Sequence, residues 1–292
     1  CSFMHGMSYC EAVEHIMGIE IPPRARYLRT IWCELSRLHS HLLWLGLLAD
    51  AFGFESLFMQ CWRLREKILD MFETSTGGRL IFSVNKIGGQ RRDMDNGMLH
   101  GFLKVLDGLE SDLKEITSTF LDNSAVNSRL KGVGVMSKEM AQEYGVAGPF
   151  LRASGIARDT RELGYDAYGD LQLEPVTAEE GDCYARTRVR IGELFQSINL
   201  IRQAVDKIPE GPISVPVRGF PKGEYMMRVE QPRGEAIYYV KANGTKFLDR
   251  FRVRTPTFAN VPAMIELMKG CQLSEIPMLI LTIDPCVSCI ER

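Results

Sequence analysis

The chain has 292 residues, of which 45% are hydrophobic and 25% are charged, and its formal net charge is -2. This composition is ordinary for a soluble globular protein and gives no electrostatic argument for nucleic acid as a partner. The longest apolar stretches, such as residues 42–49, are far too short to span a bilayer. The eight cysteines are widely spaced, which excludes the framework of a small disulfide-rich domain.

Apolar residues that recur at three- and four-residue steps predict that most of the chain is helical. Long helices are expected at residues 24–48, 55–72, 93–120 and 182–205, with shorter ones at 137–144 and 262–268. Asp93 or Asp95 is expected to cap the third long helix, and Ser137 the short helix that follows. The stretch 145–175 is rich in Gly, Arg, Asp and Tyr and is expected to be irregular.

The periodicity changes after Pro209, where the pattern becomes typical of strands. Segments 225–230, 236–241 and 251–254 alternate or are rich in β-formers, and Asn243-Gly244 is a turn signal. The predicted fold class is therefore α+β and mainly helical, with a bundle of long helices and a small antiparallel β part.

A Cys-x-x-Cys pair, Cys286 and Cys289, lies near the end of the chain and directly follows Asp284-Pro285. Two thiolates at this spacing can face one metal from a tight turn, and Pro285 stiffens the approach. A zinc site needs two further ligands, and a redox dithiol of the thioredoxin type needs a helix opening after a strand. Taken alone, the pair leaves metal binding, redox chemistry and a structural role open.

The beginning of the chain adds a second half to this pattern, because Cys1 is followed four residues later by His5. The combination C-x-x-x-H and D-P-C-x-x-C resembles the large subunit of nickel–iron hydrogenases. The resemblance implies that Cys286 is a terminal nickel ligand and that Cys1 and Cys289 bridge nickel and iron. It also implies that the fourth cysteine lies three residues before Cys1, outside this sequence. Soft thiolates suit nickel and low-valent iron.

The resemblance extends over nearly the whole chain, through "RARYLRTIWCELSRLHSHLLWLG", "FLRASGIARDTR", "GDCYARTRVRIGEL" and "VEQPRGEAIYYVKANG". These segments look like the group 4 energy-converting, membrane-associated hydrogenases (Ech and formate hydrogenlyase type). They also resemble the 49-kilodalton, quinone-site subunit of respiratory complex I, which shares the fold but lacks the metal cysteines. The resemblance implies a single domain of the hydrogenase large-subunit type over residues 1–292, truncated at the N-terminus and at the C-terminus. Many uptake hydrogenases carry a further metal-binding histidine where this chain has Arg292.

The same resemblance assigns roles to residues outside the cysteines. Arg233 would point its guanidinium at the diatomic ligands of the metals, and His5 would orient a bridging sulfur. Asp284, beside Cys286, would hydrogen-bond backbone or Arg233, and Asp159 would lie near the active-site or quinone cavity. The alternatives are an arginine in a solvated β-turn, a capping or core histidine, and a surface loop with internal salt bridges around Asp159.

The implied activity is reversible oxidation of H2 to protons and electrons at a nickel–iron centre with diatomic ligands. Electrons would leave through iron–sulfur clusters on a partner small subunit, and membrane subunits would hold the chain as a peripheral subunit at the cytoplasmic face. The alternative is a complex I-like NADH:quinone oxidoreductase subunit that lines a quinone site, where histidine and tyrosine donate protons. A third hypothesis is a structural zinc site at Cys286 and Cys289.

Other residues that attract attention have simpler interpretations. Cys33 and Cys61 sit in apolar helical patterns and are expected to be buried and inert. His39 and His41 are two apart on a helix, face different directions and are expected to pack or hydrogen-bond.

Two further sets of residues lie on the expected helices. The arginines at 186, 188 and 190 spread around a helix and predict a solvated or partner-facing surface. A glutamate relay for protons cannot be chosen from the sequence among Glu11, Glu14 and Glu34.

Overall fold

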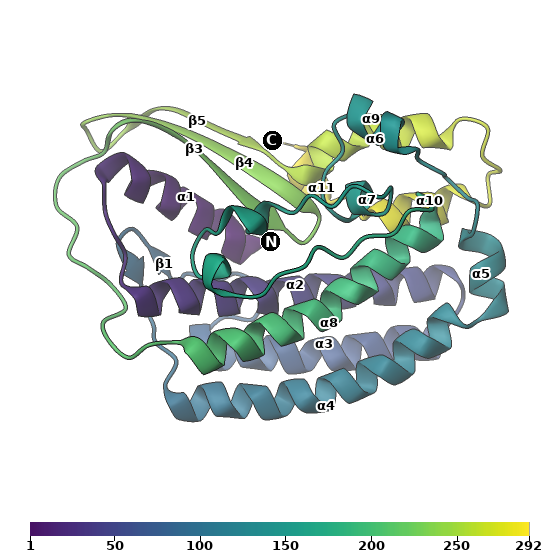
Figure 1. Ribbon diagram of the computed structural model, residues 1–292, viewed down its shortest axis with the longest axis horizontal. Coiled ribbons are helices and arrows are strands. Elements are labelled where there is room, and N and C mark those ends of the chain that lie inside the picture. The colour runs from purple at the N-terminus through teal and green to yellow at the C-terminus, as the bar shows by residue number, and fades with distance from the viewer. Residues whose placement is uncertain (292) are drawn as a thin grey trace.

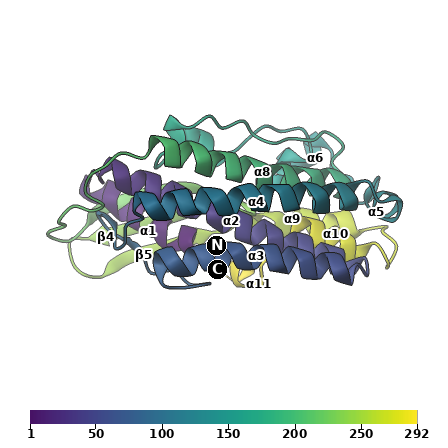
Figure 2. The same ribbon diagram turned by 90° about the horizontal axis from the view of Figure 1, so that it is seen from below.

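Four long helices form the body of the molecule in the computed structural model, which describes residues 1–291 (Figure 1). They are α2 (Pro23–Ala51), α3 (Glu55–Thr76), α4 (Asn96–Leu121) and α8 (Cys183–Lys207). Helix α2 packs against α3 and α8, and α4 packs against the same two helices from the other side. Figure 2 shows the four helices running side by side along the longest axis. The prediction of a mainly helical α+β fold is confirmed.

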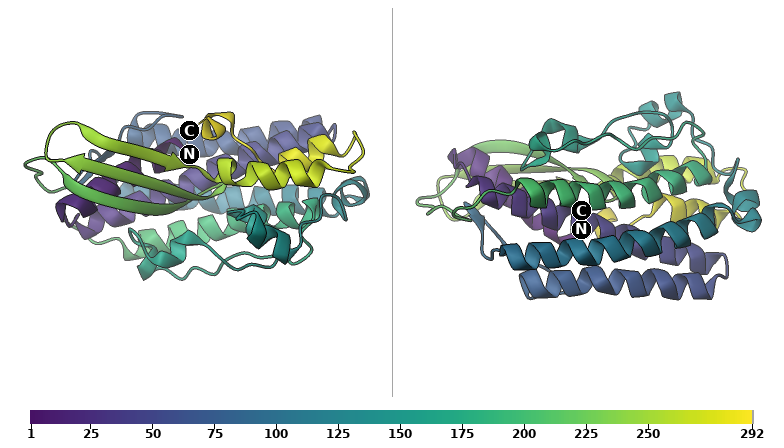
Figure 3. Two further views of the ribbon diagram at one scale, coloured as in Figure 1. Left: turned by 90° about the horizontal axis from the view of Figure 1, so that it is seen from above. Right: turned by 60° about the horizontal axis from the view of Figure 1, so that its bottom comes forward.

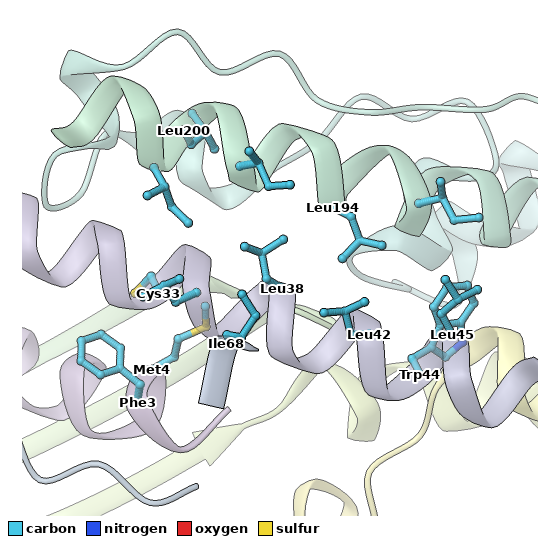
Figure 4. Close-up of a cluster of buried hydrophobic side chains, with 14 of the residues drawn as sticks. Phe3, Met4, Cys33, Leu38, Leu42, Trp44, Leu45, Ile68, Leu194 and Leu200 are labelled. Carbon is cyan, nitrogen blue, oxygen red and sulfur yellow. The ribbon is translucent and has the colours of Figure 1, made fainter. Parts of the chain in front are cut away.

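Helix α2 lies at the centre of the molecule and is buried on nearly every side. Its leucines Leu38, Leu42 and Leu45 face Leu194 and Leu200 of α8, as Figure 4 shows. Two tryptophans of α2 are also buried, one beside α3 and one below α10. Such burial of large apolar side chains is the main favourable term that holds the bundle together. The helix therefore offers a rigid base from which polar side chains can be positioned.

A three-stranded antiparallel sheet covers helix α1 (Ser2–Met17) on one side of the bundle (Figure 3). Its strands are β3 (Lys222–Gln231), β4 (Gly234–Asn243) and β5 (Leu248–Arg254), in that spatial order. The three predicted strands are confirmed, and each is longer than the sequence pattern indicates. A small hairpin of β1 (Asn85–Lys86) and β2 (Gly89–Gln90) lies beside α1.

Short helices connect these units and close the end of the molecule that carries the C-terminal segment. They are α5 (Ser124–Leu130), α6 (Lys138–Glu143), α7 (Pro149–Arg152), η1 (Thr160–Leu163), η2 (Tyr168–Asp170), α9 (Pro256–Met268), α10 (Ile276–Ile283) and α11 (Val287–Ile290). The caps predicted at Asp95 and Ser137 are confirmed, since each side chain accepts a backbone N–H three residues ahead. Between α7 and α8 the chain is irregular apart from η1 and η2, as the sequence predicts.

Some elements differ from the predictions. Helix α9 begins at Pro256 rather than at Pro262, because Thr255 caps it and Pro256 occupies the first turn, where a missing N–H costs nothing. The sequence analysis did not predict α1 or α10. Helix α10 has only eight residues and no charged side chain, so it is hard to tell from a short buried strand by its pattern alone. No helix among the described residues is both long and apolar enough to cross a membrane.

Candidate metal centre

The turn between β3 and β4 projects Arg233 toward the two ends of the chain. Gly234, at φ 128°, follows the turn, and its backbone lies against Gly148. A Cβ atom at Gly234 would lie 2.6 Å from the backbone nitrogen of Gly148, so only glycine fits this approach. Arg37 of α2 donates to the carbonyls of Glu230 (2.8 Å) and Gln231 (3.2 Å). The base of the turn is thereby fixed to both α2 and α7.

The Arg233 guanidinium lies between the first residue of the chain and the segment that precedes α11. Its Nε donates to the carbonyl of Asp284 at 2.8 Å, and one terminal nitrogen contacts Asp284 Oδ1 at 2.9 Å. The other terminal nitrogen lies 3.6 Å from Cys1 Sγ and 3.4 Å from Ser40 Oγ. Arg233 is half-buried, and its head is held by protein groups rather than by water alone. A solvated turn arginine would not be held in this way.

Asp284 holds a strained backbone conformation that turns the chain out of α10 and toward the cysteine pair. Its φ is 60°, in the left-handed region, and its N–H closes the last turn of the helix. Its carboxylate is 2.9 Å from Arg233 and 3.3 Å from Arg190 of α8. Burial lowers the pKa of Arg190 to about 10, against the attraction of Asp284. Two arginines therefore pin the residue next to Pro285.

The prediction of a solvated arginine face on α8 is wrong for two of its three residues. Arg186 and Arg190 are buried, and only Arg188 is exposed, where it pairs with Glu180. Arg186 donates to the carbonyls of Gly134 and Gly181 and to the hydroxyl of a threonine on α10. The helix pattern did not reveal this, because the groups that accept from these arginines come from distant loops and from the end of α10.

Cys286 and Cys289 form one tight turn beside Arg233. Cys286 occupies the N-cap position of α11. The N–H of Cys289 donates to the backbone carbonyl of Cys286 at 3.0 Å. The N–H of Cys286 donates to Thr257 Oγ1 at 3.3 Å, and Thr255 donates to the carbonyl of Cys289. A hydrogen bond from the Cys289 thiol, helped by the charge of Arg233, lowers the pKa of Cys286 to about 5. The pKa of Cys289 is raised in turn by its hydrogen bond to Cys286 and by burial.

Cys1 and the Cys286–Cys289 pair surround the same guanidinium, although they come from opposite ends of the chain. Arg233 contacts Cys1 Sγ, and its charge acts on both of the other thiols. Figures 1 and 3 show the beginning of α1 beside α11. Three soft donors next to a fixed cation are a donor set that suits a thiophilic metal. Among residues 1–291, however, no three ligand side chains already stand at metal-binding separations, and Arg292 lies outside the described residues.

His5 lies one turn into α1, where its backbone N–H donates to the carbonyl of Cys1 at 3.1 Å and its ring contacts Tyr238 of β4. Its role in orienting a bridging sulfur stays a prediction. Its Nδ1 is hydrogen-bonded to the hydroxyl of Tyr238, and the ring centroids are 5.9 Å apart. Tyr238 also accepts from the side-chain amide of Gln231 at 3.1 Å. His5 is thus tied to the base of the turn that carries Arg233. Sequence analysis missed Tyr238, Ser40 and Arg190, because nothing in their local pattern indicates which segments meet in space.

Asp159 belongs to a separate group of buried charges, which we call the buried ion network. The network joins α2, α7, the loop before η1, α8 and β3, and its charged members are Glu34, Arg37, Arg152, Asp159, Arg161, Glu193 and Glu230. Asp159 lies 2.7 Å from Arg161 and 3.4 Å from Arg152. Against the cost of burial, the two arginines hold the pKa of Asp159 well below its usual range. Asp159 is buried, so the alternative of a surface loop is wrong for it. Its chain neighbours Arg158 and Thr160 line a cavity of about 350 Å³ together with Glu230, and a role for Asp159 beside an active-site or quinone cavity stays a prediction.

The simpler interpretations of other residues are confirmed. Cys33 and Cys61 are fully buried thiols. His41 Nε2 lies 2.8 Å from Glu193, and His39 lies 3.3 Å from Arg65 on α3. The two histidines serve different neighbours, as their spacing on α2 predicts.

A family model and the most similar relatives of known proteins both assign the chain to one oxidoreductase family. The family described as respiratory-chain NADH dehydrogenase, 49 Kd subunit, matches residues 51–220 and 217–292. The carbon monoxide-induced hydrogenase of Rhodospirillum rubrum is 41% identical over 295 residues, which cover 100% of this chain and 82% of that protein. The membrane-bound hydrogenase subunit alpha of Pyrococcus furiosus is 39% identical, over 100% of this chain and 73% of its own length.

Relatives named for quinone chemistry are nearly as similar. An NADH-quinone oxidoreductase subunit of Akkermansia muciniphila is 36% identical over 96% of this chain and 75% of that protein. Hydrogenase subunits and quinone oxidoreductase subunits therefore stand together among the relatives, which is what the motifs along the chain imply. The chain belongs to the oxidoreductase family of the 49-kDa subunit of respiratory-chain NADH dehydrogenase, to which energy-converting hydrogenase large subunits are homologous.

Proposed function

We propose that the chain is the catalytic subunit of a nickel–iron hydrogenase that interconverts H2 with protons and electrons in a membrane-associated complex. The observation that carries the proposal is that Cys1, Cys286 and Cys289 meet around Arg233. Cys1 contacts Arg233 although the two residues are 232 positions apart in the sequence. Quinone-site subunits of this fold need no such thiols. The similarity to two hydrogenase subunits over the full chain supports the same proposal.

The thiolates of Cys1, Cys286 and Cys289 would hold the nickel–iron pair. A bound nickel–iron pair would supply the Lewis acidity that polarises and splits H2. Cys286 is half-buried beside a fixed cation, so its sulfur can hold a proton or release it with little change in geometry. Arg233 would orient diatomic ligands with the fork of its guanidinium, and Asp284 keeps that fork aimed.

The electrons need a carrier, because the cysteines beyond these three do not form a second cluster motif in the sequence. We propose an iron–sulfur small subunit as the immediate partner and membrane subunits beyond it, with the chain at the cytoplasmic face.

Metal analysis of the intact, matured complex tests the proposal. We expect close to one nickel per chain in the wild type, and loss of both nickel and H2-dependent dye reduction in Cys286→Ser. Cys271→Ser is the matched control, because Cys271 is a half-buried thiol just after α9 that donates to a backbone carbonyl, as serine also can. Nickel at background in the wild type, or unchanged in Cys286→Ser, would overturn the assignment.

Arg233→Lys separates the role of the guanidinium from that of its charge. Lysine keeps the charge but loses the planar fork that holds the Asp284 carbonyl and carboxylate together. We expect nickel content to be kept while turnover falls roughly 10- to 100-fold, as for other groups that orient metal ligands. Unchanged turnover would contradict the proposed role.

A second candidate is a quinone-reductase subunit, which the match to the 49-kDa subunit family and the Akkermansia relative favour. The same complex, assayed with a water-soluble quinone in the absence of H2, distinguishes the two. Quinone reduction that is insensitive to Cys286→Ser would favour this second function.

A further inference from the structure

A cavity of about 270 Å³ lies between α1, the start of α2, the loop before η2 and β3. Its wall includes the carboxyl groups of Glu11, Glu14 and Asp166 and the guanidinium of Arg29. His15 is exposed and Arg26 is half-buried, and both line the cavity on its solvent side. The three acids are more than nine-tenths buried, so this is an interior acidic group with an opening rather than an exposed acidic patch.

The guanidinium of Arg29, which lines this cavity, is already paired with one of the three acids, Glu14. Arg29 forms two hydrogen bonds of 2.8 Å with Glu14, and the N–H of Gly88 donates to the same carboxylate. Arg29 lies 3.9 Å from Asp166 Oδ1, which is a weaker contact. Arg26 donates to the backbone carbonyl of Asp166 and pairs with an exposed aspartate, not with the Asp166 carboxylate. Among the described residues, therefore, no ion pair involves Glu11, and Asp166 has only the long contact with Arg29.

The two remaining carboxyls belong to residues that line the same cavity. Glu11 Oε2 and Asp166 Oδ2 are both buried, and neither has another hydrogen-bond donor as partner. Two carboxylates cannot donate to one another, so a hydrogen bond between them requires that one carries a proton. The backbone of Asp166 is held at φ 48°, and the N–H of the next residue, Ala167, donates to Thr30 Oγ1 of α2.

We propose that Glu11 and Asp166 form a proton-binding site, in which the two carboxyls share one proton that enters and leaves through this cavity. The site lies about 15 Å along α1 from Cys1, at 1.5 Å rise per residue. The proposal depends on the cavity and the two carboxyls alone and stands whether or not the chain holds nickel.

The electrostatic surroundings agree with a shared proton near neutral pH. Burial, followed by the charge of Asp166, raises the pKa of Glu11, and burial raises the pKa of Asp166 to about 6. The other titratable and charged groups that face the pair come from every element around it. They are Cys10, Glu14 and His15 of α1, Arg26, Arg29 and Cys33 of α2, and Tyr165 of the loop.

Infrared pH-difference spectra of the intact complex test the proposal directly. A protonated carboxyl has a C=O stretch that a carboxylate lacks. We expect the wild type to show this band near neutral pH, and Glu11→Gln and Asp166→Asn each to lose it. Both substitutions keep the shape of the side chain and supply an amide N–H donor in place of the protonated carboxyl. Asparagine also tolerates the left-handed backbone of Asp166. Glu20→Gln, at an exposed site just after α1, is the control and should leave the band unchanged.

Stability measurements give an independent readout if one variant folds poorly. A carboxyl with a raised folded pKa binds its proton more tightly when folded, so its contribution to stability is lost as pH rises through that pKa. We expect Glu11→Gln to gain stability relative to wild type between pH 5 and pH 8, and Glu20→Gln to show no such trend. Absence of the infrared band in the wild type would overturn the proposal, and stabilisation by added Na⁺ would then identify an ionised pair that binds a cation instead.

Discussion

Two charged regions lie on either side of the β3–β4 turn, and they differ in how completely they are paired. In the buried ion network, every carboxylate oxygen of the four acids has a hydrogen-bond or ion-pair partner among the described residues. Around Arg233, by contrast, the guanidinium contacts Asp284, Ser40 and the thiol of Cys1, and its charge acts on the thiols of Cys286 and Cys289. Cys1 and Cys286 are partly exposed. Carboxylates that are all paired stabilise the fold. A fixed guanidinium beside partly exposed thiols can instead bind a ligand.

The contrast separates scaffold from chemistry within a single fold. Arg37 connects the two regions, because it pairs with Glu34 in the network and holds the end of β3 beside the turn. A change in the network should therefore reduce stability first, and a change at Arg233 should reduce turnover first. Four predictions test this division.

The largest effect on stability is expected from Glu193→Gln in the network. Glu193 accepts from Arg152 and lies against His41, and all three side chains are fully buried. Breaking such a pair leaves a buried cation without its anion, so we expect a loss of about 3–5 kcal/mol in the free energy of unfolding. Glu180→Gln, which breaks the exposed pair with Arg188 near the same helix, should cost less than about 1 kcal/mol. Urea unfolding measures both, and equal losses would contradict the division.

Gly234→Ala tests whether the turn itself links the two regions. The added Cβ would lie 2.6 Å from Gly148 N and 2.7 Å from its Cα, in a backbone conformation that alanine rarely adopts. We expect a loss of about 3 kcal/mol and a displaced Arg233. Gly101→Ala on the exposed side of α4 is the matched control and should gain roughly 0.5–1 kcal/mol, since its Cβ meets nothing. Retained turnover in Gly234→Ala would show that Arg233 does not depend on this contact.

The pH dependence of stability should reveal the titration of His41, the buried histidine that contacts Glu193 of the network. Burial lowers the pKa of His41 to about 4, despite its hydrogen bond with Glu193. The folded chain therefore binds this proton more weakly than the unfolded chain, whose histidine has a pKa near 6.5. Stability is fully present above pH 6.5 and falls as pH drops toward 4, by about 2 kcal/mol between pH 7 and pH 5.

His41→Gln should remove that part of the pH dependence, because glutamine does not titrate. Thermal unfolding at pH 7 and pH 5 compares the variant with the wild type. A pH dependence that persists unchanged in the variant would assign it to other groups, such as His39.

The smallest effect is expected from Ser40→Ala beside Arg233. Ser40 Oγ receives only a long hydrogen bond of 3.4 Å from the guanidinium, whose contacts with Asp284 are shorter. We expect a change in the free energy of unfolding of at most about 1 kcal/mol and turnover close to wild type. A large loss of turnover would mean that this hydroxyl, and not Asp284 alone, aims Arg233.

The sequence predicted the long helices, the strands and several caps, because these depend on local patterns such as apolar spacing at 28–48 and the Asp95 cap. It did not predict the burial of Arg186 and Arg190, since several of their partners, Gly134, Thr282 and Asp284, lie 52 to 96 residues away. The same reason explains why Tyr238 was missed as the partner of His5, 233 residues away.

For the candidate site, the residues could be named but not their arrangement. The resemblance pointed to Cys1, Arg233, Asp284, Cys286 and Cys289. In the structure the other four residues lie around the guanidinium of Arg233. Asp159 instead lies in the buried ion network. The carboxyl pair of Glu11 and Asp166 follows from a cavity and from the partners of Arg29, which no spacing in the sequence reveals.

The contact between Arg233 and Cys1 also has a consequence for biosynthesis. Because it joins residues 232 positions apart, and Cys286 and Cys289 are later still, the three thiols can meet only after all of these residues have been synthesised. Closing so long a loop is slow and depends on the helices and the sheet having formed first. Insertion of any metal must therefore be a late event, and before it occurs the reactive sulfurs need protection from oxidants by an assembly factor or by a reducing environment.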